Sequence, residues 1–439
     1  MLPKTMSTYK RRPLIDTRLI ALLACLAVML LQPVMAKNAL QCDLNNGGIT
    51  LPAGFCATVF ADDLGVARHM VISSNGDVYV ALQSLHDGDG IVALRDTTGD
   101  GHANMVRYFG TKSGTGIGIH NGYLYFASNT EVLRYKLLPG QLLPDPHPQV
   151  VVNGFPEQHE HSPKTIALDG AGHLYVNVGA PSNACQREDR LPGSPGINPC
   201  PLLAQHGGIW DFDADKLNQV FGKDGSRFAT GIRNAVAITW NAEAGALYAV
   251  LMGRDQLYDN WPKLYSAQQS AELPAEEFIL IHRGENFGWP YCYYDQLQNK
   301  RVLAPEYGGD GKKSGDCASY GLPLLSFPGH WAPEAVLFYS GNLFPTVYRK
   351  GAFISFHGSW NRAPLPQAGY KVVFVPFNGR RPPGGYQIFA DGFAGETPIL
   401  TPNTAHYRPM GLAQGPDGAL YIGDTQHGRI WRVIYTGKF

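Results

Sequence analysis

The sequence lacks the features that mark several large classes of protein. It has no CxxCH segment, so it carries no attachment site for a c-type haem, and it has no pair of CxxC motifs of the zinc-binding kind. Apolar residues at the 3.6-residue period of a helix are scarce. Basic residues are not in excess, because 36 Lys and Arg stand against 36 Asp and Glu. These absences argue against a covalent haem protein, a zinc module and a helical bundle.

The first 36 residues differ from the rest. Five basic residues precede or begin an apolar run from Leu19 to Leu31, and Val34-Met35-Ala36 offers small side chains for cleavage. This is the pattern of a secretory signal peptide, and the run is short for a membrane span. Residues 22–25 loosely resemble a lipoprotein box, but they lie within the apolar run. We predict a signal peptide at 1–36, a single domain at 37–439, and a periplasmic or secreted protein.

Removal of residues 1–36 leaves 31 basic and 35 acidic residues, a net charge near −4. Such a chain has no electrostatic reason to bind nucleic acid or an anionic membrane. Six of its seven cysteines remain, and an even number in an exported chain favours disulfides. Six cysteines allow 15 pairings. Neighbours in sequence suggest Cys42 with Cys56, Cys185 with Cys200, and Cys292 with Cys317.

One short motif recurs six times along the chain. In each copy a turn glycine is followed by a β-branched or aromatic run, which is typical of strands. An apolar segment precedes each copy, and a third strand-like segment follows it. The copies are GDVYVAL from Gly76, GYLYFAS from Gly122, GHLYVNV from Gly172, GALYAVL from Gly245, GAFISFH from Gly351 and GALYIGD from Gly418.

Six copies of one strand unit predict an all-β, six-bladed β-propeller. A β-sandwich is the alternative, but it would need edge protection that the pattern does not provide. The spacing between copies is uneven because two insertions, at about 180–207 and 284–333, lengthen it. They hold four of the six remaining cysteines, so we expect two long loops closed by disulfides. Long loops on a rigid scaffold often carry function.

Charged residues stand just before the first strand of several repeats. In a propeller these positions converge around the axis on one face, and they are occupied by Arg68-His69, Glu160-His161 with Lys164, Arg233-Asn234, and Arg408. Each arginine taken alone could simply pair with a neighbouring acid. Together, three arginines and a lysine at one mouth favour an anionic ligand. His161 adds a group that exchanges protons near neutral pH.

Acidic turns are the other candidate ligand sites. The segment from Asp96 to Asn104 spaces two aspartates around glycine, which fits an Asp/Gly turn first and a calcium loop second, because it lacks the bidentate Glu of an EF-hand. The segment MGRDQL, from Met252 to Leu257, follows a predicted strand and could offer backbone carbonyls to a hard cation at the mouth.

Longer stretches of the sequence also resemble those of a known family, and together they span nearly the whole mature chain, roughly 45–437. The sequence resembles the pyrroloquinoline quinone (PQQ)-dependent sugar dehydrogenases, the soluble glucose, aldose and L-sorbosone dehydrogenases. The matching stretches are EHSPKTIALDGAGHLYVNVGAPSNAC, FATGIRNAVAITWN, GRDQL, PAEEFILIHRGENFGWPYCYYD, FPGHWAPEAVLFYSGNLFP, FISFHGSWNR and YRPMGLAQGPDGALYIGDTQHGRIWRV.

The resemblance implies a propeller that binds PQQ and Ca²⁺ at its axis and oxidises a sugar, an aldose or a sorbosone-like aldehyde. His161 matches the base that takes the hydroxyl proton, and Arg233 and Asn234 match a pair beside the quinone oxygens and the substrate. Gly253 and Arg254 fall where carbonyls ligate the calcium. Cofactor contacts are implied for the basic residues at the mouth and in the fifth repeat: Lys164, Arg233, Arg408, and His357 or Arg362. Trp331 falls where it would line the sugar pocket.

Two positions depart from the pattern. Met252 stands where a polar residue is expected, and Glu160 stands where an aspartate often precedes the base. Because no haem is attached, the resemblance also implies a separate electron acceptor, a quinone or a soluble cytochrome. The alternatives are a calcium-dependent propeller hydrolase of the lactonase kind and a non-catalytic carbohydrate-binding propeller. The first would favour carboxylate and Asn side chains at the axis, whereas the second would not need both His161 and Arg408.

Overall fold

The computed structural model describes residues 1, 3–6, 8 and 42–437, so almost all of the predicted signal peptide lies outside the described residues. The chain divides into a unit from Met1 to Ala39 and a unit from Leu40 to Phe439. The fold described below is that of the second unit.

Six antiparallel sheets of at least four strands form the blades of a propeller. Blade one has β2 (Ala67–Ile72), β3 (Val78–His86), β4 (Asp89–Arg95) and β5 (Met105–Phe109). Blade two has β6 (Gly114–His120), β7 (Tyr123–Ser128), β8 (Val132–Lys136) and β9 (Gln149–Asn153), with β13 (Gln219–Val220) added in parallel. Blade three has β10 (Ile166–Leu168), β11 (His173–Val178), β12 (Gly208–Asp213) and β14 (Ser226–Thr230), with β18 (Glu285–Asn286) added in parallel.

The remaining blades follow the same order. Blade four has β15 (Ala237–Asn241), β16 (Ala246–Leu251), β17 (Glu276–Ile281) and β21 (Leu325–Phe327). Blade five has β22 (Pro333–Phe338), β23 (Gly351–Phe356), β24 (Lys371–Pro376) and β25 (Gln387–Ala390). Blade six has β26 (Pro409–Gln414), β27 (Leu420–Asp424), β28 (Ile430–Tyr435) and β1 (Phe55–Ala61).

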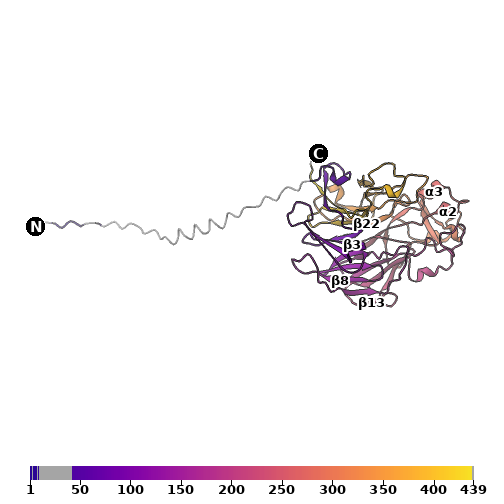
Figure 1. The fold of residues 1–439 in the computed structure, drawn as a ribbon, viewed down its shortest axis with the longest axis horizontal. Helices are drawn as coiled ribbons and strands as arrows, with labels where there is room; N and C mark the ends of the chain where they lie inside the picture. The colour runs from indigo at the N-terminus through magenta and orange to yellow at the C-terminus, as the bar shows by residue number, and fades with distance from the viewer. Residues whose placement is uncertain (2, 7, 9–41, 438–439) are drawn as a thin grey trace. The chain divides into compact units, whose positions relative to one another are not determined.

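Blade six closes the ring with strands from both ends of the described chain. β1 pairs antiparallel with β28, and Phe55 lies opposite Tyr435 in the register. Figure 1 shows this closure as indigo chain beside yellow chain. The first strands of the blades contact one another in cyclic order, from β2 through β6, β10, β15, β22 and β26 back to β2. The prediction of a six-bladed propeller is therefore confirmed.

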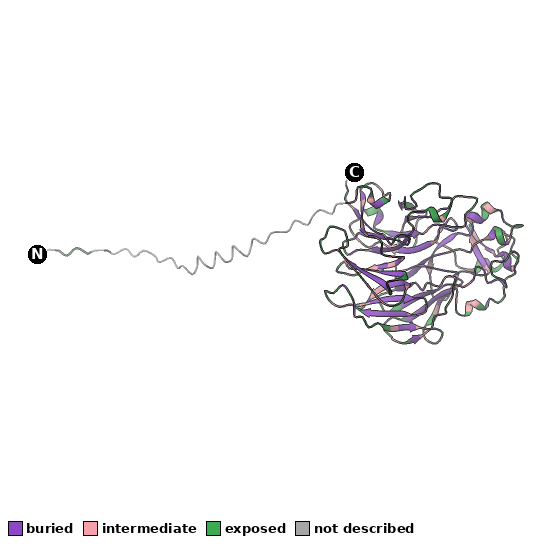
Figure 2. Ribbon diagram, in the orientation of Figure 1, coloured by how far each residue is buried: buried purple, intermediate pink, exposed green. Residues whose placement is uncertain are grey.

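The hydrophobic core lies between the blades rather than at a single centre. Each of the six blade interfaces holds one cluster of buried apolar side chains. In β3, Val78, Val80 and Leu82 face blade six, while Tyr79 and Ala81 face blade two. Figure 2 shows the strands as mostly buried and the loops as mostly exposed. Because both faces of a blade are covered, its strands are continuous apolar runs without polar alternation.

The tyrosine of the repeated motif ties neighbouring blades together. Tyr79 donates to the Leu142 carbonyl at 2.9 Å, and Tyr125 donates to the Ala214 carbonyl at 2.8 Å. In the fourth repeat, the Tyr248 hydroxyl donates to the backbone carbonyl of Arg380 in blade five at 2.9 Å. The tyrosine ring fills the interface between two blades, and its hydroxyl forms a hydrogen bond across that interface. These two contacts explain why tyrosine recurs in the motif.

Both insertions are closed by disulfides. The predicted pairs Cys42–Cys56, Cys185–Cys200 and Cys292–Cys317 are all formed. The loop after blade four's second strand carries α2 (Leu257–Asn260) and α3 (Ala267–Glu272), and the second insertion carries a hairpin of β19 (Cys292–Asp295) and β20 (Lys300–Leu303). No helix among the described residues is long and apolar enough to cross a membrane.

Candidate functional site

The catalytic candidate His161 lies in the turn before β10, at the mouth of blade three. Its backbone is left-handed, with φ of 52°, and its Nδ1 lies 2.6 Å from the Ala180 carbonyl. A carbonyl only accepts, so Nδ1 carries the hydrogen and Nε2 keeps its lone pair. Burial and then the nearby Arg233 charge lower the pKa of His161 to about 4. The side chain is therefore a neutral base at pH 7.

Glu160 does not orient His161. Its carboxylate instead accepts from Arg190 Nε and Nη2, at 2.9 and 3.0 Å. His159 is exposed, as a surface residue should be. The orienting partner of His161 is thus a backbone carbonyl at the start of the first insertion.

Arg233 and Asn234 lie beside this base, just before β15. Arg233 Nη1 donates to the Gly253 carbonyl at 2.6 Å, and Nη2 donates to Asp255 Oδ2 at 2.8 Å. Its Nε is buried and has no partner among the described residues. Asn234 Nδ2 lies 3.5 Å from the sulfur of Met252. Met252 therefore fills its position as a weak acceptor for Asn234.

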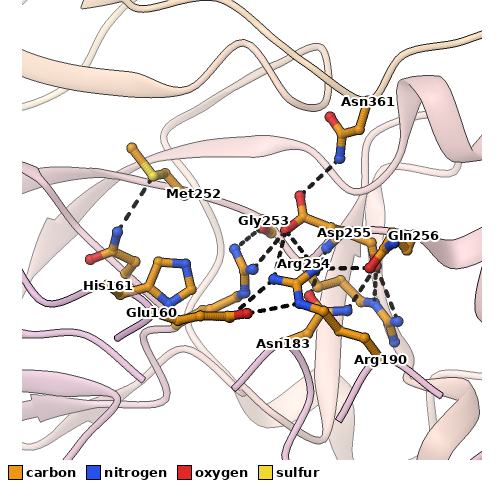
Figure 3. A network of polar contacts seen from close by, with 12 residues as sticks. Glu160, His161, Asn183, Arg190, Met252, Gly253, Arg254, Asp255, Gln256 and Asn361 are labelled. Atoms are coloured by element: carbon orange, nitrogen blue, oxygen red, sulfur yellow. Dashed lines mark hydrogen bonds and ion pairs between the residues drawn. The ribbon is translucent and has the colours of Figure 1, made fainter. Parts of the chain in front are cut away.

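Asp255 is the centre of the polar network in Figure 3. Besides Arg233, its carboxylate accepts from Asn361 Nδ2 at 3.0 Å and lies 3.4 Å from Arg190 Nη2 and 3.5 Å from His330 Nδ1. Burial alone would raise the pKa of Asp255, but Arg233, His330 and Arg190 hold it well below the ordinary value. Asp255 is therefore charged at neutral pH.

Arg408 and His357 form a second group, which joins blades five and six. Arg408 Nε donates to the His357 carbonyl at 3.1 Å and Nη2 donates to the Gly358 carbonyl at 2.6 Å. No carboxylate among the described residues lies within ion-pair distance of its guanidinium. His357 Nε2 lies 2.8 Å from Thr425 Oγ1, and burial followed by the Arg408 charge keeps the pKa of His357 well below the ordinary value.

Lys164 is the most buried of the basic residues. Its side chain is fully inaccessible, and its ammonium donates to the Ser162 carbonyl at 2.7 Å. No carboxylate in the described part of the chain forms an ion pair with it. Burial lowers the pKa of Lys164 to about 8, so it keeps most of its charge at pH 7. A buried cation without a counter-charge indicates a site for an anion.

Other basic residues at the mouth already have acidic partners. Arg68 Nη2, in blade one, pairs with Glu334, in blade five, at 3.2 Å. Arg254 Nη1 pairs with Glu306 at 2.5 Å, and both side chains are almost fully buried. The simple reading of each mouth arginine as half of an ion pair therefore applies to Arg68 and, through Asp255, to Arg233, but not to Arg408.

The side-chain contacts of Arg362 and Trp331 are with residues outside the network around Asp255. Arg362 Nη1 donates to the carbonyls of Ala271 and Gly329, and its Nη2 pairs with Glu272 at 2.5 Å. Trp331 packs in the core between blades four and five. The roles implied for them as cofactor contact and pocket wall stay predictions.

Several side chains of the site were not singled out from the sequence: Asp255, Arg190, His330 and Asn361 in the network around Asp255, and Glu334 beside Arg68. Asp255 lies within GRDQL, two residues after Gly253, so it belongs to a segment that the sequence comparison had already marked as part of the site. The others lie on loops or strand ends, and their partners are 30 to 266 residues away in sequence.

The donor set fits the group that the resemblance implies. Among the residues that the structure describes, Arg408 and Lys164 form no ion pair with an acid, and Arg233 has an unpaired buried nitrogen. PQQ carries three carboxylates, which such cations bind. For calcium, the available oxygens are backbone carbonyls such as that of Gly253, because no group of three or more His, Cys, Asp or Glu side chains in the described ranges could hold a metal. The segment Asp96–Asn104 is a turn, in which Asp96 accepts from the backbone of Thr98, Gly99 and Gly101.

Comparisons with known proteins agree on one group. The TrAA12-like family model matches residues 49–436. A PQQ-dependent pyranose dehydrogenase of Coprinopsis cinerea is 27% identical over 286 residues, which cover 55% of this chain and 36% of the relative. The chain spans less than half the length of the curated relatives that it matches first.

Solved structures share the fold. The holo PQQ domain of the Coprinopsis cinerea pyranose dehydrogenase has a TM-score of 0.70 at 19% identity, with 88% of this chain and 97% of that domain covered. The calcium structure of a Trichoderma reesei family AA12 enzyme has a TM-score of 0.71 at 20% identity, with 91% and 99% covered.

Proposed function

Because this chain belongs to the TrAA12-like family of PQQ-dependent oxidoreductases, we propose that it is a quinoprotein that oxidises a sugar, an aldose or a sorbosone-like aldehyde. The electrons pass to an external acceptor, a quinone or a soluble cytochrome. The observation that carries the proposal is the geometry around His161. A neutral imidazole with a free Nε2 lies beside Arg233, in a mouth where Lys164 and Arg408 lack acidic partners.

The residues of this chain perform the proton chemistry. His161 Nε2 accepts the hydroxyl proton of the sugar, while Nδ1–H stays bonded to the Ala180 carbonyl, so the ring keeps its orientation as it becomes charged. The low pKa of His161 then favours release of this proton to solvent. PQQ, when bound, supplies the hydride acceptor, and Ca²⁺ supplies Lewis acidity.

We assign the cofactor to the cations that face the mouth. Lys164, Arg233 and Arg408 supply charge for the carboxylates, and Asn234 and His357 supply polar contacts. The carbonyls of Gly253 and Arg254 are assigned to calcium. The Gly253 carbonyl already accepts from Arg233 Nη1 at 2.6 Å, so a cation there would share this oxygen with the guanidinium or displace it.

We further propose a periplasmic or secreted location. The three disulfides suit an oxidising compartment. The signal peptide at 1–36 lies almost entirely outside the described residues, so this part of the proposal rests on the sequence.

The test is reconstitution of the purified protein with PQQ and Ca²⁺, followed by dye reduction with a panel of aldoses and sorbosone. We expect PQQ absorbance to remain with the protein after gel filtration and at least one sugar to reduce the dye. Retained quinone without activity on any sugar would favour a binding propeller. Neither retention nor activity, together with calcium-dependent lactone hydrolysis, would favour the hydrolase alternative.

A further inference from the structure

Arg190 bridges two acids of the candidate site, one in the turn before β10 and one in the loop after β16. Its Nε and Nη2 donate to the two oxygens of Glu160, at 2.9 and 3.0 Å. Its Nη1 and Nη2 both lie 3.4 Å from Asp255 Oδ2, and Nη1 also donates to Gln256 at 2.8 Å. The guanidinium thus contacts Glu160, Asp255 and Gln256, which come from two different loops (Figure 3), and its Nε also lies 3.7 Å from the carboxylate of the neighbouring Asp189.

The first insertion holds Arg190 firmly. The disulfide Cys185–Cys200 closes the loop around it, and Gln186 Oε1 accepts from the Arg190 backbone N–H at 3.0 Å. Arg190 itself has a φ of 60°, a left-handed conformation that an arginine adopts only when its surroundings impose it. The insertion therefore holds the Arg190 side chain in a defined position.

The two acids bonded by Arg190 are those that adjoin the reacting groups. Glu160 directly precedes His161, and Asp255 holds Arg233 Nη2 at 2.8 Å. Without Arg190, Glu160 would lose both of its charged hydrogen bonds, and Asp255 would keep Arg233 as its single close guanidinium. The turn that carries His161 would then have no side-chain tie to blade four through Glu160.

We propose that Arg190 is a positioning residue for the oxidation: it ties Glu160 to Asp255 and so fixes His161 relative to Arg233. This inference rests on the proposed function of the site. It assigns a role to the disulfide-closed insertion, which contributes none of the residues implied for cofactor or base.

The charges around His161 predict the direction in which its pKa should change when Arg190 is removed. The groups that face His161 are Arg233, which lowers its pKa, and Asp255 and Glu160, which raise it, while the Ala180 carbonyl bonds Nδ1. Arg190 offsets the charge of both acids. Its removal leaves their negative charge acting on His161, which should then bind a proton more readily.

The experiment compares Arg190→Gln and Arg190→Lys with Arg187→Gln. Arg187 is exposed on the same insertion, so its substitution makes the same charge change away from the site. The His161 titration is measured by NMR in the protein without cofactor, with the His161→Gln spectrum used to assign the signal. The pH dependence of kcat/KM is measured after loading with PQQ and Ca²⁺.

For Arg190→Gln we expect the His161 midpoint to rise by about one pH unit, roughly a tenfold stronger proton affinity. We expect kcat/KM to fall at least about tenfold, and more at pH 5 than at pH 8, because geometry is lost at every pH and the neutral base is lost only at low pH. Arg190→Lys should restore the midpoint but only part of kcat/KM, because an ammonium does not replace a planar fork.

If Arg190→Gln behaves like Arg187→Gln in both measurements, the proposal is wrong. If Arg190→Gln does not fold, Glu160→Gln provides the test from the other partner: the His161 midpoint should move down rather than up, while kcat/KM still falls. Unchanged kcat/KM in Glu160→Gln would also overturn the proposal. Inactive wild-type enzyme would refute the proposed function instead, and the NMR titration would still report on Arg190.

Discussion

Replacement of His161 by Gln should abolish most of the sugar oxidation while the protein still binds PQQ. General base catalysis contributes about 10²–10⁴-fold, so kcat should fall by that factor. Gln keeps a polar group near the Ala180 carbonyl but cannot accept a proton at neutral pH. The quinone contacts assigned to Lys164 and Arg408 are untouched, so PQQ retention after gel filtration should match that of the wild type.

The wild-type pH profile tests the same residue without mutation. With a pKa of about 4, His161 is about nine-tenths neutral at pH 5, whereas an ordinary histidine with a pKa of about 6.5 is only about 3% neutral there. The value of kcat/KM should therefore stay nearly flat from pH 8 to pH 5 and halve near pH 4. Stopped-flow dye reduction at saturating and limiting sugar concentrations measures both constants.

The pH dependence of the unfolding free energy should also reflect the titration of His161. The pKa of His161 is lower in the folded protein than in the unfolded chain, so protons bind the unfolded chain more tightly. Its contribution is complete above about pH 6.5 and is lost as the pH falls toward 4, by up to about 3 kcal/mol. In His161→Gln this part of the acid sensitivity should disappear from urea titrations. A fully active variant with bound PQQ, or an acid limb near pH 6.5 in the wild type, would contradict the reasoning.

Three further predictions concern buried charge and the first insertion. Lys164→Met should raise the unfolding free energy of the cofactor-free protein at pH 7 by up to about 3 kcal/mol, because it removes a buried cation that has no acidic partner. The same variant should bind PQQ more weakly in equilibrium titrations, and equal PQQ affinity would argue against the anion site. Arg254→Met should lower the unfolding free energy by about 3–5 kcal/mol in urea, because Glu306 stays buried without its partner. Adding Glu306→Gln should recover part of this loss, and no recovery would mean that packing rather than charge is responsible. Serine at Cys185 and Cys200 should lower the unfolding free energy by about 3 kcal/mol in thermal melts and reduce kcat/KM more than PQQ affinity; unchanged kcat/KM would show that the insertion does not need its disulfide to position the site.

The blades could be predicted from the sequence because each blade contains a recognisable copy of the same short motif. A turn glycine before an apolar run marks each second strand, and burial on both faces makes the run continuous. The fourth strands were not predicted. Segments such as β21 (Leu325–Phe327) and β25 (Gln387–Ala390) are short and lie at the outer edge of their blades, where partial exposure removes the apolar signal. Local sequence therefore specifies the inner and middle strands better than the edges.

The site could be predicted only as a set of positions. Residues before the first strands, such as His161 and Arg233, have places that the repeat fixes. Their partners come from loops, where the sequence carries no period. Arg68 and Arg408 looked alike as basic residues at the mouth, yet Arg68 pairs with the buried Glu334, whereas the guanidinium of Arg408 bonds only carbonyls. Which arginines are free for a ligand depends on pairing across the fold, which no local pattern encodes.

The pairing of β1 with β28 makes the ring a structure that is completed last. Phe55 can pair with Tyr435 only after nearly all of the described chain has been synthesised, so blade six cannot assemble before β28 has left the ribosome. A chain that stops before Ile430 would leave β1 without its partner and β27 of blade six with an unpaired edge. Chains interrupted before β28 should therefore expose unpaired strand edges that promote aggregation, whereas chains that include β28 can close the ring.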